Sequence, residues 1–407
     1  MIIEFEKEKC DGATNSVAIS CPVCGSGQLT IFFVMLEMPI FSNILRKNQQ
    51  EALNCLKGDI KLAFCSRCGY INNIAFDPKL VNYEQQGYEK SLDYSPRFQD
   101  YSRSLAMGII ERYNLFGKNV IEVGCGNGNF LSSLCMLGNN CGVGFDPSNI
   151  EREVSISKKS LHISFIQDYY SKKYSNYPAD LIVCRQTLEH IPYPRSFLGD
   201  LRTIIGDRLK TDVFFEVPNA LSTLRNTFCW DIIYEHCSYF IPDSLLAIFS
   251  LSEFNIREIT ESFGGQFLCV YSKPNGKHKT FTNYQPNAGI VTSYVSSLTA
   301  NWQSKTNALR LKLDKIKKNK QRCVVWGAGS KAVTFLNVFK ESPIEYAVDI
   351  NPHLQGSYIA GTGQEIVSPE FLSTYRPDFV IVLNSIYSNE ITLLIKKIGI
   401  ATQLLHL

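Results

Sequence analysis

The sequence has no apolar run of the roughly 18 to 20 residues that a membrane-spanning helix requires. Its most apolar stretches, Asp180–Cys184 and Asp212–Val217, have the length of strands. It also has no excess of one charge, because 41 Lys and Arg residues face 38 Asp and Glu residues and leave a formal charge of +3. Proteins that bind nucleic acid through its phosphates carry a strong basic excess. We therefore expect neither a membrane nor a nucleic acid as partner.

A secretory signal is also missing, since the first ten residues, MIIEFEKEKC, contain no apolar core. The 14 cysteines are spread over a long chain and do not frame a short disulfide-rich one. We therefore expect a reducing compartment and a cytoplasmic protein. With 407 residues, 45% hydrophobic and 19% charged, the chain is too long for one ordinary domain and too apolar for disorder. Two or three compact domains are expected.

Two short cysteine pairs stand out in residues 1–80, namely CPVCG with Cys21 and Cys24, and CSRCG with Cys65 and Cys68. Two Cys-x-x-Cys-Gly units suit one tetrahedral Zn²⁺, whereas a redox role would need a single pair at a helix start. Four thiolates close the coordination shell, so such a zinc ion is structural and has no open position for catalysis. We predict a zinc-binding module over residues 1–80.

Residues 81–275 alternate strand-like runs with helical ones, which predicts a doubly wound α/β domain. Between a strand and a helix lies the loop Glu122-Val-Gly124-Cys-Gly126-Asn-Gly128. Its glycines allow a ligand to lie against the backbone at a positively polarised helix N-terminus. Asp146 ends the following strand. The loop therefore indicates a ligand site, with a purely structural glycine turn as the alternative.

Residues 276–407 begin with a helical stretch and then repeat features of the preceding domain. VIEVGCG is echoed by VVWGAGS and GFDP by VDINP, and the interval from Gly124 to Asp146 is 22 residues, as is that from Gly327 to Asp349. This spacing is typical of the first βαβ unit of a nucleotide-binding fold. We predict a linker helix and a second Rossmann-like α/β domain that faces the first across a ligand cleft.

The second loop contains Gly327, Gly329, Ser330 and Lys331. Its backbone amides and its lysine charge both attract phosphate oxygens. The loop departs from the Gly-x-Gly-x-x-Gly pattern, which disfavours an NAD site. We expect it to anchor a nucleotide-linked substrate, with Asn384 in the same cleft.

Two groups of titratable residues also belong to the central domain. ADLIVCRQTLEHI places Glu189 and His190 just beyond a strand, where side chains of such a sheet enter the cleft. WDIIYEHCSYF brings together Tyr234, Glu235 and His236. An adjacent Glu and His supply a tunable base, and a Tyr can donate to an oxyanion. The combination suits proton removal next to a carbonyl, with the start of a surface helix as the alternative.

The acidic start of the first loop, its glycines and the acid that ends the next strand resemble the class I S-adenosylmethionine-dependent methyltransferases over about residues 120–273. The resemblance implies S-adenosylmethionine as cofactor, held at Glu122, Gly124, Gly126, Asp146, Asp168 and Gln186. Glu122 would then lie near the methionine ammonium, Asp146 at the ribose hydroxyls, and Asp168 near the adenine amino group.

Nearly the whole chain resembles the sugar C-methyltransferases that act on nucleotide-linked 4-keto-deoxysugars. Members join a four-cysteine zinc module, a methyltransferase domain and a C-terminal Rossmann-like domain. The similar motifs are the two cysteine pairs, the first glycine loop, LEH, EHCSYF, the Gly264-Gly265-Gln266 strand entry, WGAGSK and GTGQ.

This second resemblance implies that His236 is the base and that Glu235, His190, Tyr234 and Tyr88 assist it. Family members often read Tyr-His-Glu-His where this chain reads Tyr234-Glu235-His236, so Tyr234 stands one place closer to the Glu-His pair.

The expected activity is therefore S-adenosylmethionine-dependent C-methylation of a nucleotide-linked 4-keto-deoxysugar, by a monomer or a small homo-oligomer. Three alternatives stay open. One is methylation of an oxygen or nitrogen of another small acceptor, a second is methylation of an RNA base, and a third is a non-catalytic binding scaffold.

Overall fold

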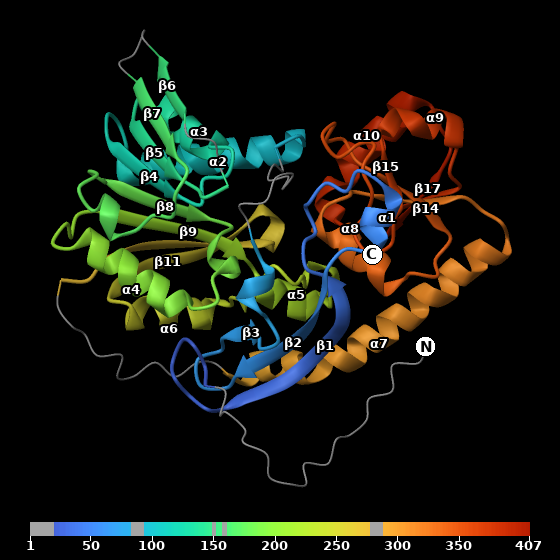
Figure 1. The fold of residues 1–407 in the computed structure, drawn as a ribbon, viewed down its shortest axis with the longest axis horizontal. Coiled ribbons are helices and arrows are strands. Elements are labelled where there is room, and N and C mark those ends of the chain that lie inside the picture. Colours follow the sequence, from blue (N-terminus) through green and yellow to red (C-terminus); the bar gives the residue numbers. More distant parts are fainter. Residues whose placement is uncertain (1–19, 83–92, 149–151, 157–160, 277–287) are drawn as a thin grey trace.

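The computed structural model describes residues 20–82, 93–148, 152–156, 161–276 and 288–407. They form three sheets, and the N-terminal sheet lies between the central and the C-terminal domain (Figure 1). No helix in these residues is long and apolar enough to cross a bilayer.

The N-terminal sheet has the strand order β1-β2-β3-β10. Its first three strands are β1 (Leu29–Pro39), β2 (Lys57–Cys65) and β3 (Ile71–Asn73), with the short helix α1 (Gln49–Leu53) between β1 and β2. The fourth strand, β10 (Ser238–Tyr239), comes from the central domain and pairs antiparallel with β3. The segment that carries Glu235 and His236 is thus anchored to the cysteine module.

The central domain is built on an eight-stranded sheet of order β11-β12-β9-β8-β4-β5-β7-β6. The strands β9, β8, β4, β5 and β7 run parallel, and β12, β11 and β6 are antiparallel additions at the two edges. The strands are β4 (Asn119–Val123), β5 (Cys141–Phe145), β6 (Arg152–Ile156), β7 (Leu161–Ile166), β8 (Leu181–Arg185), β9 (Asp212–Pro218), β11 (Phe254–Ser262) and β12 (Phe267–Pro274). The parallel core with helices between its strands confirms the predicted α/β domain.

Helices cover both faces of this sheet (Figure 1). They are α2 (Pro96–Tyr113), α3 (Asn129–Gly138), α4 (Pro194–Ile205) and α6 (Pro242–Leu251). Helix α5 (Ala220–Asn226) follows β9 and packs against α7 and the N-terminal module. α2 begins with Pro96 after Ser95, whose hydroxyl accepts a hydrogen bond from the Phe98 amide, and it ends at the left-handed Asn114. α3 begins at the glycine loop, because Gly128 is its N-cap.

The C-terminal domain has a five-stranded, fully parallel sheet of order β15-β14-β13-β16-β17. Its strands are β13 (Cys323–Trp326), β14 (Ile344–Val348), β15 (Glu365–Val367), β16 (Phe379–Val382) and β17 (Gln403–His406), and its helices are α8 (Ser330–Val338), α9 (Leu372–Tyr375) and α10 (Ser388–Ile398). The predicted second Rossmann-like unit is therefore present.

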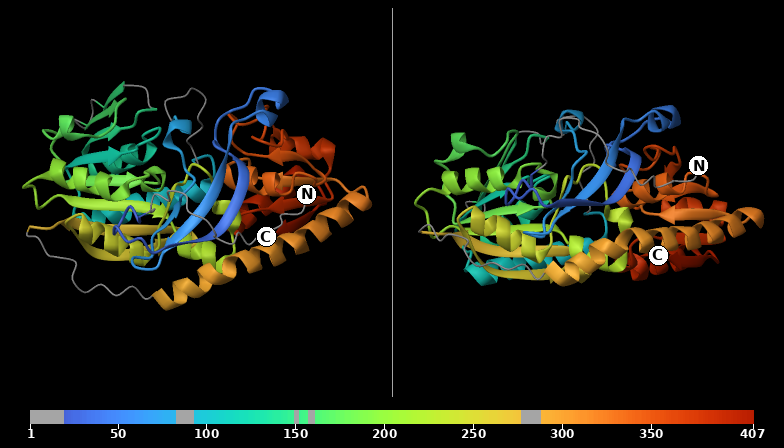
Figure 2. Two further views of the ribbon diagram at one scale, coloured as in Figure 1. Left: turned by 60° about the horizontal axis from the view of Figure 1, so that its bottom comes forward. Right: turned by 90° about the horizontal axis from the view of Figure 1, so that it is seen from below.

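The predicted linker helix is α7 (Ala288–Lys318). It runs beneath the N-terminal sheet and along the C-terminal domain (Figure 2). Thr299 donates a hydrogen bond to the Phe32 carbonyl at 2.6 Å, and the Trp302 ring packs edge-on against Phe33 and Trp230. α7 thus packs against all three units.

Candidate functional site

One cavity of about 970 Å³ lies where the three units meet. Both glycine loops line it, together with the segments around His190 and His236 and a few residues of the N-terminal module, such as Asn43 and Phe76. Its size falls in the upper part of the range usual for small-molecule sites. The cleft predicted between the two Rossmann-like domains therefore exists.

The first glycine loop packs tightly against the neighbouring residues of the protein. Gly124 has φ +71°, and a Cβ built on it would lie 2.2 Å from Thr187 Oγ1. The Gly126 amide donates to Asp146 Oδ2 at 2.9 Å, so the acid at the end of β5 holds the loop. The Asp146 carboxylate also accepts from the Ser148 amide at 2.9 Å. The structure thus brings the predicted cofactor residues Gly124, Gly126 and Asp146 to one edge of the cavity.

Glu122 lies in the middle of the sheet on β4 and is buried. Its carboxylate accepts a hydrogen bond from the Leu131 amide at 3.0 Å. Burial raises the pKa of Glu122 to about 8, and the positive charge of Arg185 and the Leu131 hydrogen bond oppose that shift. A cationic group in the cavity would favour the ionised form of this carboxyl.

Asp168 and Gln186, the other predicted cofactor residues, also line the cavity. Asp168 accepts hydrogen bonds from the Tyr174 hydroxyl at 2.5 Å and from Lys173 Nζ at 3.1 Å, which lower its pKa. Gln186 has φ +49°, and its side-chain amide donates to Glu216 Oε1 at 3.1 Å. A left-handed backbone at a residue other than glycine is uncommon and marks a position held by its surroundings.

An ion pair that sequence reasoning missed holds Gln186 in place. Arg185 pairs with Glu216 at 2.9 Å, and both side chains are nearly inaccessible to solvent. The Tyr101 hydroxyl also donates to Glu216, and the Arg185 guanidinium lies 3.9 Å from the centre of the Phe130 ring. Nothing in the spacing of these residues along the sequence indicated the network, because it joins β8, β9 and α2.

His190 and His236, the two histidines predicted to be catalytic, both line the cavity and lie side by side. The His190 and His236 ring centroids lie 4.9 Å apart at an interplanar angle of 81°. Burial lowers the pKa of His190 to about 4, and the hydrogen bond with the Glu235 carbonyl opposes the shift. Burial, and to a lesser degree the neighbouring His190, lower the pKa of His236 well below its ordinary value. Both imidazoles are therefore neutral at pH 7.

The carboxylate next to these rings is that of Glu189. Glu189, His190 and His236 each offer one ligand atom, and these atoms all lie within 4.8 Å of one another. Burial raises the pKa of Glu189 to about 8. The side chain of Glu235 instead accepts a hydrogen bond from the Ser42 amide of the N-terminal module at 2.8 Å. The sequence placed Glu189 in the cleft beside His190, as observed, but the assisting role was assigned to Glu235.

Tyr234 does not lie on the cavity wall. Its hydroxyl accepts a hydrogen bond from the Asp77 amide at 2.9 Å, and its ring packs on Phe76. The tyrosine of this segment that does line the cavity is Tyr239, whose hydroxyl donates to the Ile233 carbonyl at 3.0 Å. The position of Tyr234 thus does not support the catalytic role expected for it. Tyr88 lies outside the described residues.

The second glycine loop lines the opposite side of the cavity. Gly327 has φ +99°, and a Cβ built on Gly327 or Gly329 would meet no atom within 4 Å. The Ala328 amide donates to Asp349 Oδ2 at 2.7 Å, as the Gly126 amide does to Asp146.

Two polar contacts at this loop cross between domains. Lys331 forms an ion pair with Asp231 of the central domain, which favours its charged form, whereas burial lowers the pKa of Lys331 to about 7. The side chains of Asn384 and Gln266 exchange two hydrogen bonds, at 2.7 and 3.1 Å. Ser330 is the first residue of α8. The predicted anchor residues are thus brought together, and two of them also join the domains.

The four predicted zinc ligands form one cluster. The Sγ atoms of Cys21 and Cys68 lie 3.6 Å apart, as do those of Cys24 and Cys65. Zinc–sulfur bonds of about 2.3 Å at tetrahedral angles place the sulfur atoms about 3.8 Å apart. None of the four forms a disulfide. The spacing therefore fits a tetrahedral zinc site, and no position is left in it for a substrate.

Comparison with known protein families gives two matches within the chain. Residues 97–259 match a methyltransferase domain, and residues 280–401 match a C-methyltransferase C-terminal domain. The prediction of an S-adenosylmethionine-dependent methyltransferase domain is thereby confirmed, and so is the prediction that the C-terminal unit is one found in C-methyltransferases. Neither match identifies a sugar.

Curated relatives match about three tenths of the chain. The ubiquinone biosynthesis O-methyltransferase of Proteus mirabilis is 28% identical over 132 residues, which are 31% of this chain and 51% of the relative. The protein of the same name from Escherichia coli O127:H6 is 27% identical over 121 residues, 28% of this chain and 47% of the relative. The chain thus spans about half the length of the curated relatives it matches.

Among solved structures, the N,N-8-amino-8-demethyl-D-riboflavin dimethyltransferase of Streptomyces davawensis is 13% identical and covers 44% of this chain and 56% of its own. Its TM-score is 0.33.

Proposed function

We propose that this protein is an S-adenosylmethionine-dependent C-methyltransferase whose acceptor is a nucleotide-linked 4-keto-deoxysugar. The observation that carries the proposal is the position of two neutral imidazoles, His190 and His236, in a cavity shared by two glycine loops. The match of the C-terminal unit to a C-methyltransferase domain supports carbon as the methylated atom.

The first glycine loop is the proposed cofactor side. Gly124 and Gly126 present backbone to the cavity, and Asp146 stands at the end of β5, where an acid of this fold takes the ribose hydroxyls. Glu122 supplies a negative charge for the methionine ammonium, and Asp168 an acceptor for the adenine amino group. When bound there, S-adenosylmethionine supplies an electrophilic methyl group that a carbanion equivalent can take up, leaving S-adenosylhomocysteine.

His236 is the proposed base. A C–H bond next to a ketone is acidic enough for a neutral imidazole placed against it to remove the proton. The low dielectric of the cavity strengthens the electrostatic contacts that stabilise the charge formed. His236 takes the proton, and the electron pair of the C–H bond passes into an enolate. His190 packs against the base, and its Nδ1–H donates to the Glu235 carbonyl at 3.0 Å, which fixes the ring. His236 must return its proton to solvent after each turnover.

The second loop is the proposed acceptor side. The amides at the start of α8 and the Lys331 charge face the cavity, where a diphosphate would share Lys331 with Asp231. The open space beside Gly327 and Gly329 leaves room for a ligand against the backbone.

The four cysteines are proposed to bind a structural zinc ion. Their module contains β3, which pairs with β10, and β10 begins two residues after His236. Zinc would thus help to fix the position of His236 through the strand pairing and would take no part in the reaction.

A second candidate is O-methylation of a small acceptor. The observation that favours it is that the curated relatives are O-methyltransferases. A neutral His236 suits removal of a hydroxyl proton equally well.

The test combines product analysis with proton exchange. Protein with intact zinc and S-adenosylmethionine is incubated with a panel of nucleotide-linked 4-keto-deoxysugars, and the new methyl signal is assigned by NMR. A methyl group on a ring carbon is expected, and a methoxy signal would move the reaction to oxygen. In D₂O without cofactor, the proton next to the ketone should exchange.

The matched variants are His236→Gln and His162→Gln. In His236→Gln the proton next to the ketone should no longer exchange, and the turnover number should fall by about 10²–10⁴-fold. The affinity of this variant for S-adenosylmethionine should be unchanged. His162 is exposed on β7, so His162→Gln should retain both. Exchange that persists in His236→Gln would exclude His236 as the base, and the absence of transfer to every sugar of the panel would contradict the proposed acceptor.

A further inference from the structure

Glu189, His190 and His236 combine the donor types that borderline divalent metals prefer. Their ligand atoms lie within 4.8 Å of one another on the cavity wall. Metal–nitrogen and metal–oxygen bonds of about 2.0–2.2 Å place neighbouring ligands about 3.4 Å apart in a tetrahedron, so only modest side-chain movements would close the triad on one ion.

The hydrogen bond of His190 selects the tautomer that such a site needs. His190 Nδ1 lies 3.0 Å from the Glu235 carbonyl oxygen, and a carbonyl can only accept. The proton is therefore on Nδ1, and Nε2 keeps its lone pair. Metal-bound histidines are characteristically held in this way, with the second ring nitrogen donating to a carbonyl or carboxylate.

Glu189 adds a buried oxygen whose hydrogen-bonding capacity is unused. Its side chain is 2% exposed, and among the described residues Oε2 has no hydrogen-bond partner. A buried carboxylate oxygen without a partner is costly, and a cation beside it removes that cost.

We propose that Glu189, His190 and His236 form a second metal site, which takes a divalent ion such as Zn²⁺, Co²⁺ or Ni²⁺. Two imidazoles and one carboxylate suit these ions, whereas Ca²⁺ and Mg²⁺ prefer oxygen ligands alone. The site differs from the four-thiolate cluster because three protein ligands leave coordination positions open toward the cavity.

Occupation of this site has a consequence for catalysis, which rests on the proposed function. The nitrogen with which His236 would bind a metal is the one that would accept the proton from the acceptor. The two uses exclude each other. Zinc in excess of the structural ion should therefore inhibit methyl transfer and the cofactor-free proton exchange together.

The binding test is a titration of zinc-loaded protein with Co²⁺, followed by absorption spectroscopy and by metal analysis after gel filtration. We expect the protein to bind one equivalent of Co²⁺ in addition to its zinc. The spectrum should show the weak d–d bands of Co²⁺ with nitrogen and oxygen ligands and no thiolate charge-transfer absorption. Glu189→Gln keeps the size of the side chain but removes its charge and should weaken Co²⁺ binding by at least ~10-fold, since loss of even an outer-shell partner costs about 10–100-fold.

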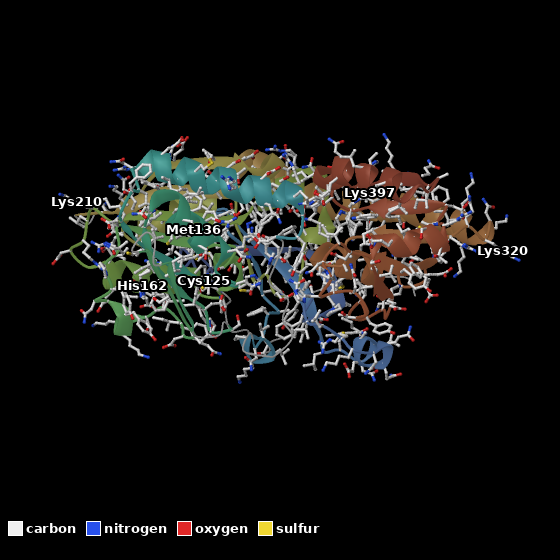
Figure 3. The ribbon with its side chains drawn as sticks, turned by 90° about the horizontal axis from the view of Figure 1, so that it is seen from above. Cys125, Met136, His162, Lys210, Lys320 and Lys397 are labelled. Carbon is white, nitrogen blue, oxygen red and sulfur yellow. The ribbon has the colours of Figure 1, made fainter. Side chains whose placement is uncertain are left out.

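The matched control is His162→Gln, which removes a histidine from the periphery of the central domain (Figure 3) and should bind Co²⁺ as the parent does. An unchanged melting temperature and cofactor affinity show that Glu189→Gln is folded. The proposal is overturned if the zinc-loaded protein binds no Co²⁺ or if thiolate absorption appears. It is also overturned if Glu189→Gln binds Co²⁺ as tightly as His162→Gln does.

The activity test separates this inference from the proposed function. Co²⁺ binding at the triad without transfer to any sugar would contradict the proposed function and leave the site standing. Transfer that is unaffected by Zn²⁺ at concentrations that fill the triad would overturn the mutual exclusion.

Discussion

The two glycine loops that face each other across the cavity share a backbone plan but differ in what surrounds it. Each follows a central parallel strand, and in each an acid at the end of the next strand accepts a loop amide, Asp146 from Gly126 and Asp349 from Ala328. The first loop packs tightly against protein, whereas the second is open where a Cβ would point. A repeated backbone therefore does not imply a repeated ligand.

Charge separates the two loops as well. Two residues before Gly124 the first strand carries Glu122, and at the equivalent place before Gly327 the second strand carries Val325. The second loop has Lys331 instead, paired with Asp231. The first loop is thus suited to a ligand with a cationic group, and the second to a ligand with an anionic one.

The strongest test of this difference is Gly124→Ala. An alanine at φ +71° costs about 1–3 kcal/mol in backbone strain, and its Cβ would also collide with Thr187. We expect a loss of about 100-fold or more in affinity for S-adenosylmethionine, measured by calorimetry, and a lower melting temperature. Gly108→Ala, in helix α2 with open space around it, is the control. It should leave the cofactor affinity unchanged and should not lower the melting temperature, because alanine is the better helix former.

A smaller effect should separate the two acids. Asp146→Asn keeps one hydrogen-bond acceptor but loses the charge, and is expected to weaken S-adenosylmethionine binding by about 10-fold, the lower end of the about 1.5–3 kcal/mol that hydrogen bonds to a charged partner contribute. Asp349→Asn should leave that affinity unchanged and raise the KM for the nucleotide sugar. Equal losses of cofactor affinity in both variants would show that the cofactor does not distinguish the loops.

Gly329→Ala should have a milder effect, confined to the acceptor. Gly329 has φ −75°, and its Cβ would meet no protein atom, so the fold should tolerate alanine. If a diphosphate lies against the loop, the methyl group will hinder it, and we expect the KM for the sugar to rise about 3-fold to 10-fold with cofactor affinity unchanged. An unchanged KM in steady-state kinetics would remove the second loop from the acceptor site.

The smallest effect concerns a proton. Burial raises the pKa of Glu122 to about 8, so the carboxyl is largely protonated at pH 7 in the free protein. An ammonium group beside it lowers that pKa and releases up to one proton on binding. Calorimetry in two buffers of different ionisation enthalpy should detect this release in the parent and not in Glu122→Gln. A release of equal size in the variant would assign the proton to another group.

Much of the fold could be predicted because its signals are local. The cysteine pairs, the strand–glycine–helix passages and the 22-residue interval from glycine to acid are short-range patterns, and they locate the thiolate cluster and both loops. The α/β character followed from strand-length apolar runs that alternate with helical ones.

Parts of the site could not be predicted because they depend on contacts between distant segments. Tyr234 and Tyr239 stand in the same sequence run. In the fold the Tyr234 hydroxyl accepts from the Asp77 amide, whereas Tyr239, in the strand β10 that pairs with β3, lines the cavity. Likewise, the Glu235 carboxylate accepts a hydrogen bond from the Ser42 amide, and it is the Glu189 carboxyl that lies beside the two histidines. Sequence adjacency to a histidine was present for both acids and did not distinguish them.

The pairing of β10 with β3 also bears on how preparations of this protein should behave. The cysteines pack in the same apolar core as Phe240 and Leu245, and the two residues of β10 connect that core to His236. A molecule that has lost its proposed zinc would keep the glycine loop of the central domain but lose the packing that supports His236, its proposed base. Batches that differ in zinc content should therefore differ in specific activity in proportion, while each molecule still takes up one S-adenosylmethionine.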